Sequence, residues 1–293
     1  MPGALNSMWS DFTRRIPALN RSIRHAVAAS AFLLLAFAPS IHAQLPLAAS
    51  APASLEDRRK ALNSILQDYQ EDRLKHDPEY ASEQGDKRYN DQISDYSVKA
   101  FNDKLAREMN FMLQLAAIDP AGFTERETAS RDQLLRKFAD DQEASELKAW
   151  EMPITPSTGI QTIYPDLVAK LSFTTVNDYD DWIARLHAIP TAFDQVTENM
   201  SIGMEDHRLP SADLMARVLD QVNQMAGQKP EDSPFALPLK SFPAAVNPGE
   251  QARIKDEMLA AIGKEVLPAY LRFARFLEVS YIPACRRQPA VSN

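Results

Sequence analysis

The histidines are the first residues to test for metal chemistry. Two of the five, His25 and His42, lie in an N-terminal segment with a basic and then an apolar stretch, which leaves His76, His187 and His207. A helical zinc site of the type His-Glu-x-x-His needs two imidazoles four residues apart, so that both project from one face with the glutamate as base. His187 and His207, the nearest pair, are too distant in sequence to share a helical turn. The sequence predicts no zinc site formed by these residues.

The segment GMEDHR, residues 203–208, is the most promising acid–base cluster. Glu205 and His207 are two residues apart, a spacing that points them to different sides of a helix. A helix end of mixed charge, exposed to solvent, explains the cluster better than a catalytic pair does.

The segment NDYDDW, residues 177–182, carries three carboxylates and invites comparison with a calcium loop. It lacks the glycine and the distal bidentate glutamate of such loops. Asp178, Asp180 and Asp181 fit the first turn of a helix instead, where the helix dipole favours negative charge. We expect a structural cap here.

Two further kinds of nucleophile also lack support. Cys285 is the only cysteine, so it cannot form an internal disulfide, and no histidine lies near it in sequence to act as a base. We expect a buried thiol, which is the usual state of a free cysteine. No Gly-x-Ser-x-Gly motif is present. The sequence therefore predicts no catalytic residue, no metal ligand and no bound cofactor of its own.

The elements that would position these residues are predicted to be helices. Glycine is scarce, with 8 residues, whereas proline reaches 20, and no segment alternates as a strand. The expected helices start from caps at Ser54, Thr124, Ser211 and Asn247 and cover residues 54–76, 98–117, 124–150, 177–186, 190–204, 212–226 and 248–277. Residues 151–176 are expected to be irregular and residues 227–247 to form a Pro-rich connection. The fold class is all-α, with long Pro-rich connections.

Two of these helices carry more specific expectations. In the helix 98–117, an apolar stripe is predicted to comprise Val98, Phe101, Leu105, Met109, Met112, Leu113 and Ala116, with Lys104, Arg107 and Glu108 opposite. In the last helix, Pro268 should produce a kink, since proline lacks the N–H and its ring clashes with the preceding turn.

The N-terminus has the pattern of a secretory signal peptide. Four arginines precede the apolar stretch 26–41, and a small residue, Ala43, is placed for cleavage before Gln44. A retained membrane anchor is the alternative, but the apolar run is shorter than the roughly 20 residues that span a bilayer. We expect residues 1–43 to be removed, residues 44–53 to form a linker and the product to be periplasmic or secreted. Translation starts at Met1 or Met8, and no cysteine suggests a lipid anchor.

The charge balance argues against nucleic acid as a partner. The chain has 32 basic and 40 acidic residues, a net charge of −8. Removing residues 1–43 takes away four arginines and one aspartate, so 28 − 39 gives −11. An acidic surface repels phosphate backbones. We also expect no membrane association after signal cleavage.

Four stretches occur in an order that resembles one bacterial family. They are DYDDWIARLHAIP (178–190), GMEDHRLP (203–210), SPFALPL (233–239) and LPAYLRFARFLEVSYIPACR (267–286). Together with the signal-like N-terminus, they are similar to the N-terminal half of the bacterial DUF885 family, whose members look like gluzincin-like, all-helical zinc metallopeptidases with a deep central cleft. The resemblance covers roughly residues 54–287, and residues 288–293 form an unmatched tail.

The resemblance implies chemistry that these residues do not carry. The family's zinc motif, His-Glu-x-x-His followed by Pro-Gly-His, lies beyond the Tyr-Ile-Pro-x-x-Arg segment and is not found in this sequence. Zinc and a peptide substrate are thus implied for the full-length family only, and no metal ligand or base can be carried onto a residue of this chain. What the resemblance implies here is a structural role, as helices that form one wall of a cleft.

Three functions therefore remain open. The chain is a truncated member without catalysis alone, a complete periplasmic binding or interaction protein, or one half of a split peptidase whose partner is a separately encoded C-terminal half. The DNA beyond codon 287 and the neighbouring genes discriminate between them, because a truncated or split member predicts a His-Glu-x-x-His segment there.

Overall fold

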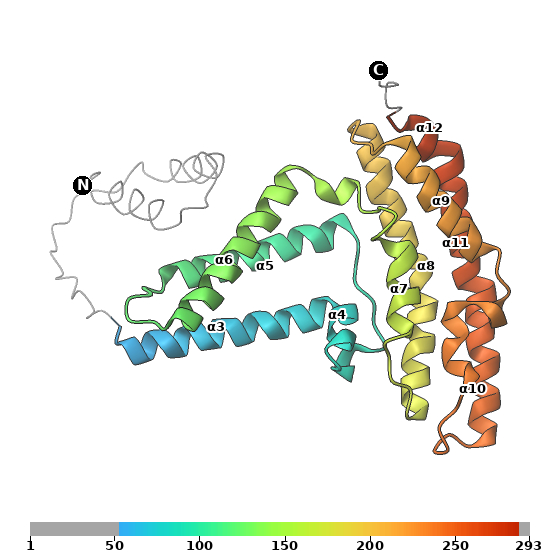
Figure 1. The fold of residues 1–293 in the computed structure, drawn as a ribbon, viewed down its shortest axis with the longest axis horizontal. Helices are drawn as coiled ribbons and strands as arrows, with labels where there is room; N and C mark the ends of the chain where they lie inside the picture. Colours follow the sequence, from blue (N-terminus) through green and yellow to red (C-terminus); the bar gives the residue numbers. More distant parts are fainter. Residues whose placement is uncertain (1–52, 287–293) are drawn as a thin grey trace, which may run out of the picture. The chain divides into compact units, whose positions relative to one another are not determined.

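The computed structural model describes residues 53–286, and all regular elements in that range are helical (Figure 1). Extended pairing among these residues is limited to one isolated bridge between Ser211 and Arg286. The all-α prediction is confirmed. The predicted signal peptide, its cleavage point at Ala43 and Gln44, nearly all of the linker and the tail lie outside the described residues. Within residues 53–286, no helix combines the length and the apolar character that crossing a bilayer requires.

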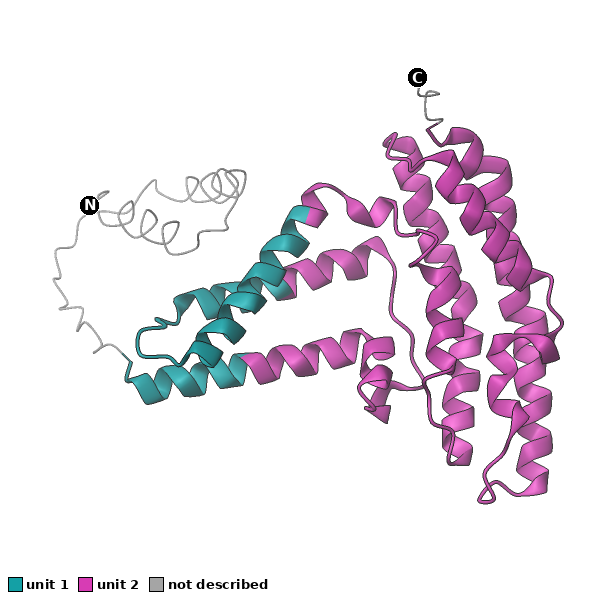
Figure 2. Ribbon diagram, viewed as in Figure 1, with its two compact units in different colours: residues 1–65, 108–143 teal, residues 66–107, 144–293 magenta. Residues whose placement is uncertain are grey.

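The chain divides into two compact units (Figure 2). Unit 1 combines the described residues up to Ile65 with Glu108–Glu143, and unit 2 combines Leu66–Arg107 with Ala144 onward. Three helices contribute to both units: α3 (Leu55–His76), α5 (Val98–Ala117) and α6 (Glu125–Glu146).

The helices of unit 1 begin at the caps that the sequence predicts. At the start of α3, the Ser54 hydroxyl accepts a hydrogen bond from the Asp57 N–H at 3.1 Å. At the start of α6, the Thr124 hydroxyl accepts from the Glu127 N–H at 3.2 Å, while the Glu127 carboxylate accepts from the Thr124 N–H at 2.7 Å. This reciprocal arrangement is a capping box. Both predicted helix starts are confirmed because their partners lie within one turn.

The buried face of α5 differs from the predicted stripe. Glu108 is only 3% exposed, whereas Leu113 is 52% exposed. The buried residues of α5 are Glu108, Met112 and Leu115, which follow helical spacing but start from a charged residue. Lys137 on α6 lies 3.0 Å from the Glu108 carboxylate and supplies the opposite charge that makes this burial tolerable. The apolar pattern of residues 98–117 could not predict the burial of Glu108, because Lys137 lies on a different helix.

Unit 2 contains the larger set of helices. They are α4 (Pro78–Glu83), α7 (Ile160–Val168), α8 (Val176–Glu205), α9 (Ala212–Ala226), α10 (Pro248–Ala261), α11 (Leu267–Phe276) and α12 (Ile282–Ala284), with short 3₁₀ turns at Lys87–Tyr89, Ala149–Glu151, Pro230–Asp232 and Pro234–Lys240. α10 and α11 pack on α8, and α9 packs on α11 (Figure 1). α7 packs on the Pro234–Lys240 turn and on α8.

α8 is one helix where the sequence predicted two. It runs without interruption over 30 residues, with Pro190 inside. Its cap is Thr175 paired with Asp178, so the helix begins at Val176, one residue before the predicted start. Ile189 and Ala192, on either side of the proline, are both fully buried. The packing of these neighbours outweighs the hydrogen bond that proline cannot make.

The prolines of the C-terminal helices follow widened turns. The π-turn Ile262–Val266 precedes Pro268, and the Leu267 N–H bonds to the Ile262 carbonyl five residues back. A second π-turn, Leu277–Tyr281, precedes Pro283. A widened turn moves the carbonyl with which a proline ring would otherwise clash. At Pro268, where a kink was predicted, the structure has an extra residue in the preceding turn.

The core of unit 2 is aromatic and includes the Pro-rich connection. The ring of Phe193 lies 4.6 Å from that of Tyr270 and 5.2 Å from that of Phe273. The Trp182 indole N–H donates to the Phe235 carbonyl at 3.1 Å, which ties α8 to the connection. Cys285 is 6% exposed, so the predicted buried thiol is confirmed, and burial raises its pKa.

α7 lies in the segment 151–176 that was predicted to be irregular. It is nine residues long, begins directly after Gly159 and contains Pro165. Its buried residues are Ile160, Gln161, Tyr164, Leu167 and Val168. A helix this short has little intrinsic stability. Contacts with the rest of unit 2 stabilise it, and these are not visible in the local sequence.

Candidate ligand pocket

The three histidines from the sequence analysis lie on different elements. The His76 Nδ1 atom lies 3.2 Å from Asp72 at the end of α3, and the His187 Nδ1 atom lies 2.9 Å from Glu265. His207 follows the end of α8 with a left-handed φ of 57°. The three histidines therefore have different neighbours and do not form a common cluster.

Metal ligands do not converge in the described residues. In the range 53–286, no three side chains of histidine, cysteine, aspartate or glutamate lie close enough to hold a metal ion. A zinc site needs three or four such ligands at about 2.0–2.3 Å. The residues described here do not fit the zinc that the family resemblance implies, so no chemical step through zinc is derived.

The GMEDHR segment forms the exposed end of α8, as predicted, and fastens it to a buried carboxylate. Glu151 is fully buried and lies 3.2 Å from the Lys148 amine and 3.5 Å from the Arg208 guanidinium. A Cβ atom on Gly203 would lie 2.7 Å from the Glu151 carbonyl, so only glycine fits there. The segment has a structural role.

The NDYDDW segment is also structural, as predicted. The Asp178 carboxylate is 6% exposed and accepts hydrogen bonds from the N–H groups of Thr174 and Thr175, both at 2.9 Å. Lys87 lies 2.5 Å from it. Burial alone would raise the pKa of Asp178, but Lys87 and the two N–H donors outweigh it, so the pKa is lowered. The carboxylate is occupied as a helix cap.

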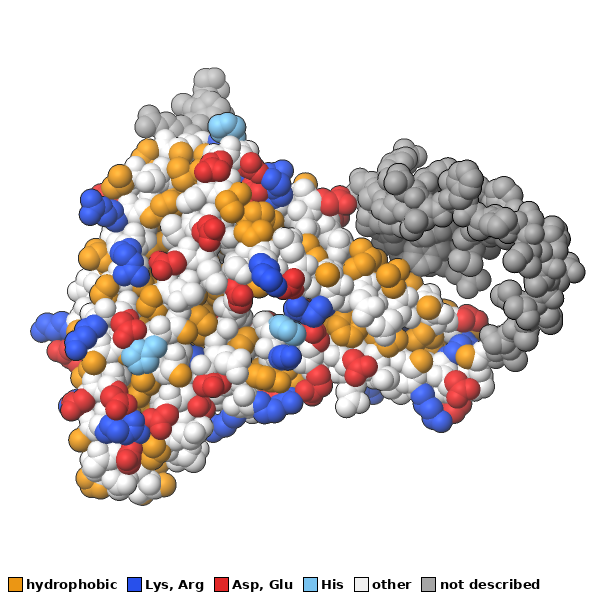
Figure 3. Space-filling model, turned by 180° about the vertical axis from the view of Figure 1, so that it is seen from behind, with side chains coloured by type: hydrophobic (Ala, Val, Ile, Leu, Met, Phe, Trp, Pro, Cys, Tyr) orange, Lys and Arg blue, Asp and Glu red, His pale blue; other side chains and the backbone are white. Residues whose placement is uncertain are grey.

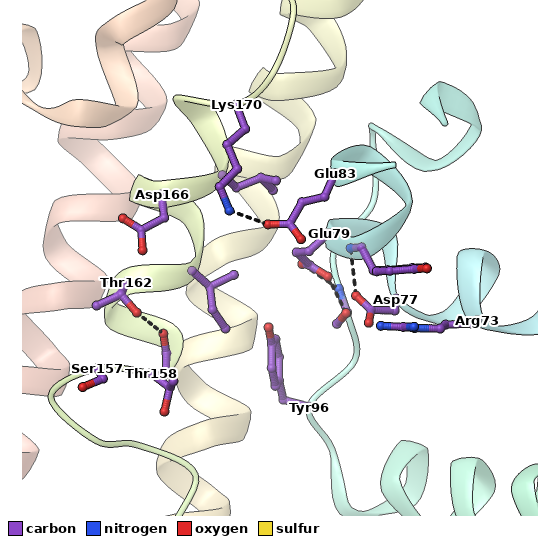
Figure 4. Close-up of a pocket in the computed structure, with 15 residues that line it drawn as sticks. Arg73, Asp77, Glu79, Glu83, Tyr96, Ser157, Thr158, Thr162, Asp166 and Lys170 are labelled. Carbon is purple, nitrogen blue, oxygen red and sulfur yellow. Dashed lines mark hydrogen bonds and ion pairs between the residues drawn. The ribbon is translucent and has the colours of Figure 1, made fainter. Parts of the chain in front are cut away.

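A pocket of about 520 Å³ in unit 2 is the strongest candidate site (Figure 4). One wall comes from the end of α3 and from α4, with Arg73, Asp77, Glu79, Tyr80 and Glu83. The facing wall comes from the turn before α7 and from α7 itself, with Ser157, Thr158, Gly159, Thr162, Ile163, Asp166, Leu167 and Lys170. Ser94 and Tyr96 complete the lining.

A buried carboxylate lies at the inner end of this pocket. Glu79 is 8% exposed, and one of its oxygens accepts hydrogen bonds from the Ser94 N–H at 3.1 Å and the Tyr164 hydroxyl at 2.9 Å. The Ser94 hydroxyl donates to the other oxygen. Burial raises the pKa of both the Tyr164 and the Tyr96 phenols. Three protein donors thus hold Glu79 in one orientation.

Arg185 on α8 fixes the loop that carries Ser94 and Tyr96. Its guanidinium is fully buried and donates to the carbonyls of Pro78 at 3.0 Å, Tyr89 at 3.1 Å and Gln92 at 2.7 Å. Burial lowers the pKa of Arg185, and the nearby charge of Glu79 opposes that change. The charge of Glu79 therefore partly offsets the burial of Arg185, and α4 and the loop up to Gln92 both depend on the hydrogen bonds of Arg185.

The outer part of the first wall combines Asp77 with a stacked pair. Asp77 caps α4 by accepting from the Tyr80 N–H at 2.9 Å. Burial raises the pKa of Asp77. The guanidinium carbon of Arg73 lies 3.4 Å from the centre of the Tyr80 ring, a cation–π contact. Across the pocket, Lys170 pairs with Glu83 at 2.6 Å.

Gly159 shapes the facing wall. Its φ of 138° is a conformation that other residues rarely adopt, and a Cβ atom there would lie 2.5 Å from the Gln161 Oε1 atom and 2.8 Å from Ile154. Glycine is therefore required where the chain turns into α7.

The pocket lining offers carboxylates, hydroxyls and tyrosine rings, whereas the three histidines of the sequence analysis and Cys285 lie elsewhere. Sequence reasoning missed all of these residues. The segment Asp77-Pro78-Glu79-Tyr80 at a helix end was the available signal, but its partners on α7 are about 80 positions further along the chain.

The surface of the described residues is mixed in charge. On the face in Figure 3, acidic and basic side chains are interspersed with apolar ones. Two large apolar side chains on the C-terminal helices of unit 2 are exposed, Leu271 by 61% and Val279 by 65%. Leu271 lies on α11, and Val279 lies in the π-turn Leu277–Tyr281 that follows it.

Comparison with known families identifies the chain at the level of a family. The model of the family described as "Bacterial protein of unknown function (DUF885)" matches residues 78–292. The chain belongs to this family. The match begins at α4, so the DUF885 region includes most of the pocket lining and all of α7 and α8. Among curated proteins, no sequence relative matches the chain.

A solved structure shares the fold of this DUF885 chain. It is described as "the putative lipoprotein from Colwellia psychrerythraea", and it superposes with a TM-score of 0.68 at 14% sequence identity. The match covers 78% of this chain and 42% of the other, so the chain spans less than half the length of that protein. At this identity, the likeness concerns the fold alone.

Proposed function

We propose that this DUF885 chain is an exported, helical, non-catalytic half of a gluzincin-like zinc metallopeptidase arrangement. In this proposal it supplies one wall of a cleft and is inactive alone, while a second helical segment supplies zinc and the base. Peptide is the substrate only when both parts are present. After the signal is removed, the chain binds neither membrane nor nucleic acid.

The single observation that carries the proposal is the extent of the structural match. A fold that accounts for 78% of this chain accounts for only 42% of the Colwellia psychrerythraea protein. The remaining part of that fold is therefore available to hold the chemistry that residues 53–286 do not offer. The arginine-rich and then apolar N-terminus supports export to the periplasm or the medium.

The exposed apolar face of the C-terminal helices supports the second segment as a partner. Leu271 and Val279 lie on consecutive helical segments, and both are more than half exposed. A helix that packs there would gain about 25 cal/mol of free energy for each Å² of apolar surface that it removes from water. Leu271→Asp should therefore weaken association with the second segment while leaving the fold of unit 2 intact.

Zinc content and peptidase activity test the inactive state. We expect the purified chain, after incubation with zinc and dialysis, to retain no stoichiometric metal by mass spectrometry and to cleave no quenched fluorescent peptide. Stoichiometric zinc together with chelator-sensitive cleavage by this chain alone would contradict the proposal.

The gene locus tests the second segment. We expect the DNA beyond codon 287, or a neighbouring gene, to encode a helical segment with His-Glu-x-x-His that co-purifies with this chain when both are expressed. If neither location encodes such a segment, the split arrangement is wrong.

A periplasmic binding protein is the second candidate, and the pocket in unit 2 favours it. The pocket is formed entirely by residues of unit 2 and has a volume of about 520 Å³, within the range typical of small-molecule sites. A monomer that binds a ligand tightly with no zinc-carrying partner would favour this candidate.

A further inference from the structure

The lining of the pocket in unit 2 is negatively charged. The lining contains two cations and four carboxylates, a formal balance of −2 when all are ionised. The cations are Arg73 and Lys170, and the carboxylates are Asp77, Glu79, Glu83 and Asp166. A partly enclosed site of one sign concentrates ligands of the opposite sign.

Contacts within the protein neutralise only part of this charge. Lys170 pairs with Glu83 at 2.6 Å, and Arg73 stacks on Tyr80. Among residues 53–286, no hydrogen bond or ion pair reaches the carboxylate of Asp166 or the second oxygen of Asp77, Oδ2. The second oxygen of Glu79 accepts one hydrogen bond, from Ser94, and a carboxylate oxygen can accept two. Acceptors are therefore available on both walls.

The arrangement of these acceptors discriminates between kinds of cation. Calcium takes six to eight oxygens at about 2.3–2.6 Å. The pocket carboxylates do not converge in that way, because in the described range no three metal-type ligands gather at one point. Asp77 and Glu79 lie on one wall and Asp166 on the other (Figure 4). Separated carboxylates suit an extended organic cation, whose N–H groups each need only one acceptor.

The tyrosines and the hydroxyls fit the same class of ligand. Tyr96 projects into the space between the two walls, and Thr158 and Thr162 lie on the α7 side (Figure 4). A tyrosine ring attracts a cation over its face and also packs against an aliphatic chain. Arg73 already occupies the ring of Tyr80 in this way, at 3.4 Å.

We infer that this pocket binds a molecule that carries an aliphatic ammonium or guanidinium group, held by Asp77 and Glu79, with its remainder directed to Asp166 on α7. The volume of about 520 Å³ accommodates a small diamine or one basic side chain of a peptide. The inference does not depend on zinc or on a second segment, so its test is independent of the test of the proposed function.

Calorimetric titration of the purified chain tests the inference. The probes are 1,5-diaminopentane, a blocked lysine (N-acetyl-lysine methylamide), the neutral 1-pentanol and the dianion glutarate. We expect saturable binding of a cationic probe, at least about tenfold tighter than that of 1-pentanol or glutarate. Binding of the diamine alone identifies a free amine as the ligand, and binding of the blocked lysine identifies a peptide side chain. No saturable binding of either cation, or equal binding of glutarate, overturns the inference.

Matched variants locate the binding. Asp77→Asn should weaken the cation affinity about tenfold, because the amide keeps the cap on Tyr80 but loses the charge. Asp194→Asn is the control, since Asp194 is 71% exposed on α8 and does not line the pocket; it should change the affinity less than about twofold. If circular dichroism shows that Asp77→Asn is misfolded, Asp166→Asn decides, with an expected loss of about threefold. Unchanged affinity in a folded Asp77→Asn or in Asp166→Asn overturns the assignment.

Discussion

Units 1 and 2 each contain a capping box of the same local design in different surroundings. In unit 1, Thr124 and Glu127 form their reciprocal hydrogen bonds at the surface. In unit 2, Thr175 and Asp178 form the same pair, but the Asp178 carboxylate is 6% exposed and also accepts from Lys87 and Thr174. Glu127 also pairs with Arg59 of α3 at 3.0 Å. The comparison shows that the same local motif joins two helices at the surface of one unit, whereas in the other it joins several elements through a buried carboxylate.

The core of unit 2 also joins more elements than that of unit 1. In unit 1, the rings of Phe111 and Phe138 stack with their centres 6.4 Å apart. Unit 2 surrounds Phe193 with rings from α11 and buries the charge of Arg185 completely. We therefore expect substitutions at buried polar groups of unit 2 to cost more than substitutions at the caps of unit 1.

The largest effect is expected from Arg185→Met. The variant removes the donors to three backbone carbonyls and leaves Glu79 buried without a compensating charge, which should lower the free energy of unfolding by about 3–5 kcal/mol. Urea unfolding followed by tryptophan fluorescence measures it, since Trp182 is buried in unit 2. Arg275→Met, at an exposed site on α11, is the control and should stay within about 0.5 kcal/mol. A loss below 1 kcal/mol for Arg185→Met would show that this buried charge does not support unit 2.

Gly203→Ala should have the next largest effect. The new Cβ atom would lie 2.7 Å from the Glu151 carbonyl, so α8 or the Glu151 turn must move, at a cost of about 1–3 kcal/mol. The same urea measurement applies. Gly227→Ala is the matched control, because its Cβ atom would meet only the Asn223 carbonyl at 3.3 Å, and its stability should change by less than about 0.5 kcal/mol. Equal stability of the two variants would refute the close contact at Gly203.

The two capping boxes test the comparison directly. Asp178→Ala should cost about 2 kcal/mol, since it removes a cap and leaves Lys87 without its partner, whereas Thr124→Ala should cost about 1 kcal/mol. Circular dichroism at 222 nm during urea unfolding measures both. If the two losses are equal, the tertiary contacts of Asp178 contribute nothing beyond the cap.

The same carboxylate predicts a dependence on pH. The pKa of Asp178 is lowered in the folded protein, so its contribution is complete above its ordinary pKa of 3.8 and is lost as the pH falls through the lowered value. Asp178→Asn should therefore flatten the loss of stability in acid below pH 3.8. A wild-type slope in the variant, measured by urea unfolding across that range, would contradict this role.

The smallest effect on stability is expected at Asp77 in the pocket, and its dependence on pH is opposite in sign to that of Asp178. Burial raises the pKa of Asp77, so its ionised form disfavours folding above the raised value, and this penalty disappears as the pH falls below 3.8. Asn caps a helix as well as Asp does. Asp77→Asn should leave stability at pH 7 unchanged or slightly higher while it weakens cation binding. A clear loss of stability at pH 7 would show that the ionised carboxylate stabilises the fold and is not reserved for a ligand.

Much of the fold was predictable, because its signals are local. The starts of α3, α6, α9 and α10 follow from a cap residue and a partner three positions later. The α5 bounds Val98–Ala117 and the all-α class follow from helical periodicity and the lack of alternation. The pocket was not predictable, since its walls come from segments about 80 residues apart and α7 itself was missed.

The sequence by itself determined that this chain is helical and where most of its helices begin. Only the tertiary structure decided that α8 continues through Pro190, that Glu108 and Arg185 are buried, and that Asp77, Glu79 and Asp166 face one cavity. Caps and periodicity act within about one or two turns of a helix, so they can be read along the chain. The burial of a charge depends on a partner whose position only the folded chain supplies.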